Sequence, residues 1–274
     1  MVAERDCYLQ ALRGICVAAV VMIHSLPELL PTVLLPTVAI RPLLNVAVAL
    51  FVFLSGYLMR TRDSFPANFF GKRLGKTLVP YAVWTVLYTI AKGRPDMIVA
   101  NLASGQASMQ LYYLLAYAQL VILTPLVIIG LRCAPILVYA VTPVFLAINV
   151  ANEALGILPF SLPPALRVYW VVFYALGMDW DRVSKALGRA RLADKTPILF
   201  ACALARLGDA SFGVYLCHAG VLVVLETLLA ALGLATGYVQ TAFLWAGTLS
   251  VSYVGTVACG RVLPRPIGKA LGFA

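Results

Sequence analysis

The 274-residue chain is 62% hydrophobic and only 12% charged, with a mean hydropathy of +0.92. Soluble domains carry about 25% charged residues, so this composition excludes an ordinary soluble domain and predicts a polytopic membrane protein. The net charge of +10 is high enough to raise nucleic acid binding as a hypothesis. The basic residues follow a membrane-topology pattern instead, and we expect no nucleic acid partner.

Apolar runs that fit a bilayer crossing recur along the whole chain. They predict an all-α bundle of about eight membrane spans (eight to ten), forming one membrane-embedded domain over residues 1–274. The predicted spans are 8–26, 43–60, 77–91, 109–131, 134–150, 165–178, 198–233 and 240–262. The seventh is interrupted at Leu207-Gly208-Asp209, which predicts a short re-entrant or interfacial piece and then a full span from about Ala210.

The basic residues predict the orientation of these spans. With the N-terminus inside, only four of the 21 basic residues fall in outer segments: Arg41, Lys92, Arg94 and Arg167. Cytoplasmic segments of membrane proteins are enriched in lysine and arginine, so this bias favours an even number of spans with both termini cytoplasmic. The inner positive charge would then face anionic lipid and cytosolic anions.

The only two histidines, His24 and His218, both lie inside apolar runs. An ionisable residue within a membrane span is a functional-site hypothesis by default. In the run LRGICVAAVVMIH, the spacing of Arg13 and His24 places both on one helix face, about 16 Å apart along the axis. His24 is then a candidate general base for an acceptor hydroxyl, and Arg13 a candidate ligand for phosphate or carbonyl oxygen. The structural alternatives are a packed, hydrogen-bonded histidine and a snorkelling arginine.

The second span, LNVAVALFVFLSGYLM, is followed by a predicted cytosolic loop, FFGKRLGKTLVPY. The small pair Ser55-Gly56 would let the backbone approach another helix or a thin ligand. In the loop, Lys72, Arg73 and Lys76 form a basic cluster. Two interpretations of this cluster stay open: a binding site for a phosphate-rich cytosolic cofactor and an amphipathic segment that anchors the chain to lipid.

In the seventh span, LGDASFGVYLCHAG brings Ser211, Tyr215 and His218 onto one helix face. This polar stripe predicts either a cavity lining or a hydrogen-bonded seam between helices. Glu153, in a predicted outer loop, is a candidate to orient His24 or bind a sugar hydroxyl, against a plain solvated charge. Tyr113 belongs to a group of aromatic residues that either form an interfacial belt or stack on a sugar. The six cysteines show no metal-ligand spacing, and we expect no metal site and no disulfide.

Four motifs, taken in order, resemble the acyltransferase 3 family of integral-membrane acyltransferases. They are Arg13 and His24 at their spacing, LFVFLSGYLM, KRLGKTLVPY and LGDASFGVYLCH, and the resemblance runs from Leu12 to Pro264. Many members O-acetylate surface polysaccharides. The resemblance implies that His24 matches the presumed catalytic histidine, Arg13 its paired arginine, and Arg73 the first basic position of an R-x-x-R motif that is a plausible CoA-phosphate site.

The chain also departs from the family pattern. Lys76 stands where arginine is usual, which weakens bidentate phosphate binding. Tyr112-Tyr113 stands where a tryptophan is common. The family usually has more spans than the eight predicted here, and the shortfall lies between Asp179 and Leu207.

We therefore expect a multi-pass O-acyltransferase of the bacterial cytoplasmic (inner) membrane. The expected donor is acetyl-CoA, or another acyl-CoA, from the cytosolic side. Its phosphates would lie near Lys72, Arg73 and Lys76, and its pantetheine arm would pass Ser211, Tyr215 and His218. The expected acceptor is a hydroxyl of a glycan or lipid-linked sugar on the outer side, contacted by Glu153 and Tyr113. The alternatives are a transporter or flippase with proton-relay histidines, and a non-catalytic membrane scaffold. The acceptor's identity, the acyl chain and the oligomeric state stay open.

Overall fold

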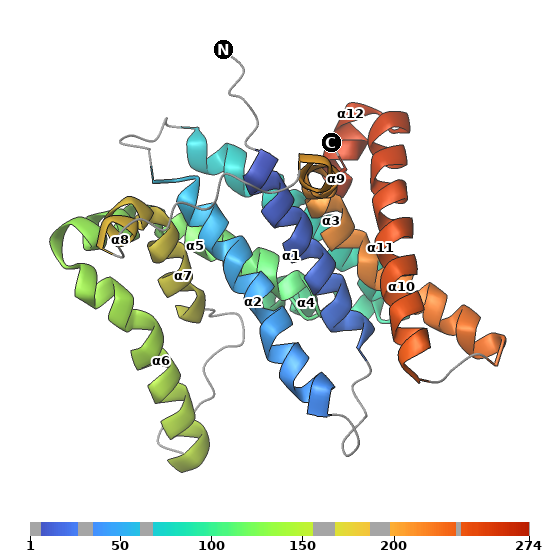
Figure 1. Ribbon diagram of the computed structural model, residues 1–274, viewed down its shortest axis with the longest axis horizontal. Coiled ribbons are helices and arrows are strands. Elements are labelled where there is room, and N and C mark those ends of the chain that lie inside the picture. Colours follow the sequence, from blue (N-terminus) through green and yellow to red (C-terminus); the bar gives the residue numbers. More distant parts are fainter. Residues whose placement is uncertain are drawn as a thin grey trace. The chain divides into compact units, whose positions relative to one another are not determined.

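The computed structural model describes residues 7–26, 35–60, 68–155, 168–186, 198–233 and 237–273. Every regular element in these ranges is a helix (Figure 1). The chain divides into two compact units, Met1–Val48 with Asp194–Ala274, and Ala49–Ala193. We describe each by itself, and the single membrane domain stays a prediction.

The first unit joins the start of the chain to its end. It contains helices α1 (Cys7–Ser25), α9 (Ile198–Asp209), α10 (Ser211–Ala231), α11 (Gly237–Val262) and α12 (Arg265–Leu271), with the first part of α2 (Leu35–Tyr57). Helix α1 runs beside α10 and α11 (Figure 1). The predicted interruption of the seventh span is confirmed, because α9 ends at Asp209 and α10 begins at Ser211.

Two glycines allow α9 to lie directly against α1. A Cβ at Gly14 of α1 would collide with the carbonyl oxygen of Leu204, and a Cβ at Gly208 of α9 would collide with that of Gln10. Small residues at helix contacts let backbones approach closely in membrane proteins, where no hydrophobic effect drives helices together. The two glycines therefore fix how closely α9 packs on α1.

The end of the chain folds back on the same unit. Gly272 ends α12 in the left-handed region, with φ of 76°, which glycine adopts without strain. Phe273 follows it and contacts Gly213 of α10 and Gly260 of α11. Phe273 thus packs against one end of the α10–α11 pair.

The second unit holds the middle of the chain. It contains the last part of α2 with α3 (Phe69–Ala91), the 3₁₀ turn η1 (Pro95–Met97), α4 (Ile98–Ser104), α5 (Leu111–Cys133), α6 (Pro135–Leu155), the 3₁₀ turn η2 (Val168–Trp170), α7 (Val171–Met178) and α8 (Trp180–Ala186). Inside it, α3 packs on α5, and α6 packs on α7.

The predicted close approach at Ser55-Gly56 is confirmed in the second unit. A Cβ at Gly56 would collide with the carbonyl oxygen of Tyr174 in α7, and one at Gly177 would collide with that of Phe53. Tyr174 is fully buried, and its hydroxyl shares a 2.8 Å hydrogen bond with Thr124 of α5. The pair is thus a helix-packing site between α2 and α7.

Among the described residues, five helical segments are long and apolar enough to cross a bilayer: Cys7–Ser25, Leu111–Cys133, Pro135–Asn152, Ser211–Ala231 and Gln240–Val262. Each agrees with a predicted span. Leu43–Tyr57 is apolar but shorter. Within the described part of 165–178, the helical elements are only η2 and α7, too short to cross. The count of eight spans and the cytoplasmic termini are therefore not confirmed.

Two predicted loops are helices instead. The basic segment that begins at Phe69 belongs to α3, because helix-forming Lys72, Arg73 and Leu74 continue directly into the apolar run. The predicted outer loop with Glu153 belongs to α6, which ends at Leu155 and also contains Asn149. There the Asn149 side-chain amide donates to the Phe145 carbonyl, 3.0 Å away, so it does not break the helix.

We expect Gly14→Ala to lower the thermal stability of the protein, because the new methyl group must push α9 away from α1. The loss should amount to about 1–3 kcal/mol, as for other overpacked contacts. Gly255→Ala is the matched control, since a Cβ at Gly255 of α11 meets nothing within 4 Å. Thermal denaturation in nanodiscs should rank wild type and Gly255→Ala above Gly14→Ala. Equal melting temperatures for all three would contradict the tight α1–α9 contact.

Candidate active site

The two histidines meet inside the first unit. His24 lies near the end of α1 and His218 in the middle of α10, and their ring centroids are 5.3 Å apart with an interplanar angle of 27°. His218 is fully buried, whereas His24 is half-buried. The sequence singled out each residue but assigned them different tasks, His24 to catalysis and His218 to the donor path. Their juxtaposition is the main addition that the structure makes to the site.

Hydrogen bonds to its own helix fix the His218 ring. Its Nδ1 lies 2.8 Å from the Tyr215 carbonyl oxygen and 3.2 Å from that of Val214. Both partners are acceptors, so Nδ1 must carry the proton and donate it. The other nitrogen, Nε2, is buried and has no hydrogen-bond partner within the described residues. In the neutral ring, this nitrogen can only accept a hydrogen bond.

Arg13 lies on the same helix as His24, as predicted. Its side chain is half-buried, and Nη1 donates a long hydrogen bond of 3.5 Å to Gln10 Oε1. On an α-helix the two residues are about 16 Å apart along the axis, too far for Arg13 to contact a group held at His24. Arg13 can therefore bind an extended substrate at a second point, but it cannot stabilise charge at the His24 ring.

Helix α11 helps to position α1. The indole Nε1 of Trp245 donates a 2.9 Å hydrogen bond to the carbonyl oxygen of Ala18, between Arg13 and His24. The partly buried indole thus bonds to the backbone of the helix that carries the candidate base. Nothing in the sequence pattern pointed to Trp245.

The remaining members of the predicted stripe on α10 are also buried. Ser211 begins the helix, and the Tyr215 ring lies 5.9 Å from that of His218, centroid to centroid. The stripe is therefore continuous and turned away from the surface. Tyr215 also contributes its carbonyl to His218, so it helps to hold that ring.

The basic cluster lies in the second unit, on the first turns of α3. Lys72 and Lys76 are exposed, whereas Arg73 is half-buried. The Nε of Arg73 donates a 2.8 Å hydrogen bond to the Tyr117 hydroxyl, and its guanidinium lies 5.8 Å from the Tyr117 ring centroid. A guanidinium anchored through Nε keeps its two Nη groups for a bidentate anion, the geometry that suits phosphate.

Tyr113 is buried one turn before Tyr117 on α5, and their ring centroids are 6.5 Å apart. It therefore lies beside the Tyr117–Arg73 contact, and its predicted sugar contact stays a prediction. The backbone of Glu153 lies in α6, but its side chain lies outside the described residues. Its predicted role stays a prediction.

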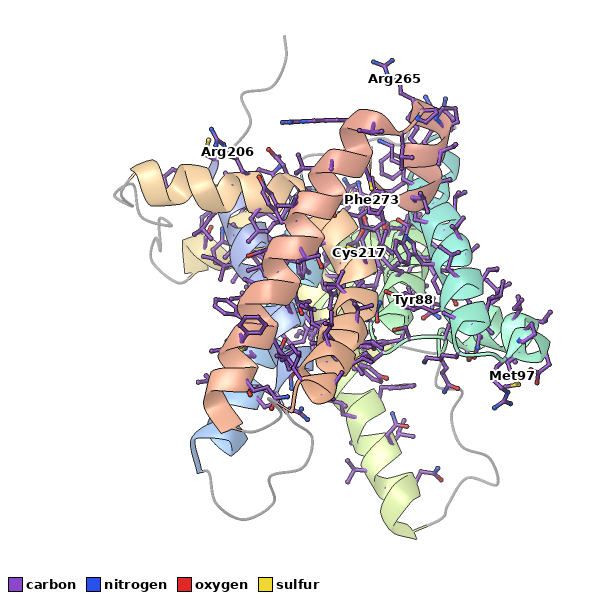
Figure 2. The ribbon with its side chains drawn as sticks, turned by 90° about the vertical axis from the view of Figure 1, so that its right-hand side faces the viewer. Tyr88, Met97, Arg206, Cys217, Arg265 and Phe273 are labelled. Atoms are coloured by element: carbon purple, nitrogen blue, oxygen red, sulfur yellow. The ribbon has the colours of Figure 1, made fainter. Side chains whose placement is uncertain are left out.

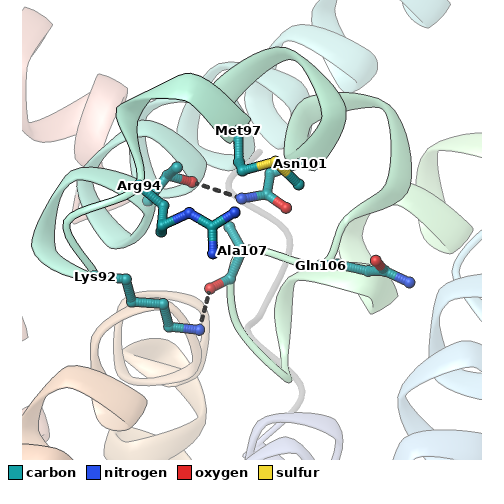
Figure 3. A pocket seen from close by; sticks show the side chains of 7 residues that line it. Lys92, Arg94, Met97, Asn101, Gln106 and Ala107 are labelled. Atoms are coloured by element: carbon teal, nitrogen blue, oxygen red, sulfur yellow. Dashed lines mark hydrogen bonds between the residues drawn. The ribbon is translucent and has the colours of Figure 1, made fainter.

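A small pocket of about 160 Å³ lies beside the turn between α3 and α4 (Figure 3). It is lined by Thr89, Lys92, Arg94, Met97, Asn101, Gln106 and Ala107. Lys92 Nζ donates to the Ala107 carbonyl at 2.7 Å, and Arg94 pairs with Asp96 at 3.5 Å. These contacts already engage both cations, and they hold the chain between α3 and α5 in place.

Among the residues that the structure describes, no group of three or more His, Cys, Asp or Glu side chains is placed to hold a metal ion. Five cysteines in these ranges are free thiols.

A family model described as an acyltransferase domain matches residues 7–205. The chain belongs to the acyltransferase 3 family. The match contains Arg13, His24 and Arg73, and it ends before α10, so Ser211, Tyr215 and His218 lie beyond it. None of the curated proteins or solved structures compared with the chain matches it. Together with the apolar helices, the family makes this chain a multi-pass membrane acyltransferase.

We expect Trp245→Phe to destabilise the acyltransferase by about 1 kcal/mol, the typical net contribution of one hydrogen bond, because the phenyl ring fills most of the space but cannot donate to Ala18. Thermal denaturation in nanodiscs measures the change. A variant at least as stable as wild type would contradict a role for Trp245 in holding α1.

Proposed function

We propose that the chain transfers an acyl group, in the simplest case acetyl, from cytosolic acyl-CoA to a hydroxyl of an extracytoplasmic glycan or lipid-linked sugar. The oxygen of the acceptor attacks the thioester carbonyl while His24 takes the hydroxyl proton. The C–S bond then breaks, and His24 returns the proton to the departing thiolate. The products are an O-acyl ester and free CoA. The proposed setting is the bacterial cytoplasmic membrane.

The observation that carries this proposal is the family membership, whose matched region includes α1 with Arg13 and His24. An imidazole is suited to accept and return a proton near neutral pH. His24 is half-buried, so a substrate can reach it, whereas His218 is fully buried. These properties favour His24 as the base.

The proposed donor site uses the anchored guanidinium of Arg73. CoA carries several phosphate groups, and a half-buried arginine held by Tyr117 is a better phosphate ligand than an exposed lysine. Lys72 and Lys76, both exposed, add attraction for the same anion. Arg13 is proposed to bind the donor at another point along its length.

A proton-coupled transporter or flippase is the second candidate function, because paired intramembrane histidines also suit a proton relay. It predicts flux that follows a proton gradient without consumption of acyl-CoA. A non-catalytic scaffold predicts that changes at His24 alter stability or partners only. The family membership favours acyl transfer over both.

We expect His24→Ala to abolish the release of CoA from acetyl-CoA by purified protein in nanodiscs with a mixed glycan extract as acceptor. Loss of a general base should lower the rate at least about 100-fold. Acetyl-CoA should still raise the melting temperature of the variant, because the phosphate site is intact. Equal CoA release by a folded His24→Ala protein would contradict the assignment of the base.

We expect Arg73→Gln to raise KM for acetyl-CoA about tenfold with little change in kcat, because it removes charge-assisted hydrogen bonds from a group remote from the reaction. Arg265→Gln is the control, an exposed arginine of α12 in the other unit that has no proposed part in donor binding (Figure 2). Steady-state kinetics should separate the two variants. The donor assignment would be wrong if both gave the wild-type KM.

A further inference from the structure

His218 has a hydrogen-bonding arrangement that leaves one nitrogen unused. Nδ1 donates to the carbonyls of Tyr215 and Val214, so Nε2 carries a lone pair. That nitrogen is buried without a partner within the described residues. A buried acceptor that lacks a donor destabilises a protein, and a phenylalanine or leucine would avoid that cost. The arrangement therefore suits a nitrogen that is used during function.

His24 has the complementary requirement. In a neutral imidazole one nitrogen bears the proton and the other is the base, and the base is oriented by whatever accepts the N–H. No acceptor for the His24 ring is present within the described residues, yet His218 is its ring neighbour. The N–H of His24 thus lacks an acceptor, and Nε2 of the neighbouring His218 lacks a donor.

The spacing of the rings permits a hydrogen bond between them. An N–H···N bond of about 3 Å between two five-membered rings, each about 1.1 Å in radius, puts their centroids about 5 Å apart. The observed rings are stacked, with their centroids 5.3 Å apart and an interplanar angle of 27°, so they have the separation for this bond but not yet its edge-to-edge orientation. The pairing therefore requires the His24 ring to turn about its side-chain bonds until its N–H points at Nε2, and the ring separation already matches that arrangement.

We propose that His218 is a positioning residue for His24: its Nε2 accepts the His24 N–H and so fixes the opposite nitrogen of His24 as the base. The proposal rests on the proposed function, since it assigns His218 a task in the same reaction. It replaces the role predicted from the sequence, in which His218 lined the path of the pantetheine arm. His218 itself exchanges no proton with the substrate, because its Nδ1–H stays bound to its own helix.

Two substitutions of His218 separate the effect of losing Nε2 from the effect of losing the ring. His218→Phe keeps a flat, buried ring but removes Nε2, whereas the side-chain amide oxygen of His218→Gln can lie near the position of Nε2 and accept in its place. We expect kcat of His218→Phe to fall about tenfold or more, the loss typical of one hydrogen bond to a group that becomes charged, with an unchanged KM for acetyl-CoA. We expect His218→Gln to recover a large part of kcat. We also expect His218→Phe to be as stable as wild type or more stable.

A second measurement does not depend on activity. Because the chain has only two histidines, protein labelled with ¹⁵N-histidine in nanodiscs gives two pairs of ring-nitrogen signals, which His24→Ala assigns. We expect His218 to carry its proton on Nδ1, and a coupling across the hydrogen bond to link its Nε2 to a nitrogen of His24. A proton on Nε2 of His218 would overturn the proposal, because that nitrogen could not then accept.

The outcomes separate this proposal from the proposed function. If wild type releases CoA and His218→Phe matches it in kcat, the positioning role is wrong while acyl transfer stands. If wild type releases no CoA with any acceptor, the proposed function and the role of His218 in it both fail. The NMR result then decides only whether the two rings pair.

Discussion

The close contact of α9 with α1 is the constraint on which the candidate site depends. Gly14 and Gly208 let the two backbones touch, and only Ala210 separates α9 from α10. Docking α9 along α1 therefore determines where α10 begins, and α10 carries His218 to His24. Trp245 of α11 binds the α1 backbone at Ala18 and supports the same arrangement. The backbone contacts that α1 makes with α9 and α11 thus set the relative positions of the His24 and His218 side chains.

The second unit also contains two helices that glycines bring into backbone contact. Gly56 and Gly177 bring α2 and α7 into backbone contact. The buried Tyr174 hydroxyl beside them is satisfied internally by its hydrogen bond with Thr124. Arg73 differs, because one edge of its guanidinium is anchored by Tyr117 and the other suits an anion. In the proposed function, Arg73 of the second unit binds the donor's phosphates.

Much of the fold could be predicted from the sequence, because a helix that crosses a bilayer needs a long apolar run. Apolar run length identified the five spans, and Leu207-Gly208-Asp209 located the break before α10. The predicted loops at Phe69 and Glu153 were wrong, because polar residues continue a helix beyond its apolar part. The pairing of His24 with His218 joins residues far apart in the chain, and helical periodicity carries no information about such contacts. The Arg73–Tyr117 and Trp245–Ala18 contacts were missed for the same reason.

The central claim is that the His24–His218 pair serves acyl transfer to an acceptor on the membrane face opposite the donor. Proteoliposomes with radiolabelled acetyl-CoA outside and a glycan extract trapped inside test it most directly. The account predicts labelled O-acetyl ester on the trapped glycan and free CoA outside, both lost with His24→Ala. Flux of protons with intact acetyl-CoA, or labelled ester only on glycan added outside, would contradict the account.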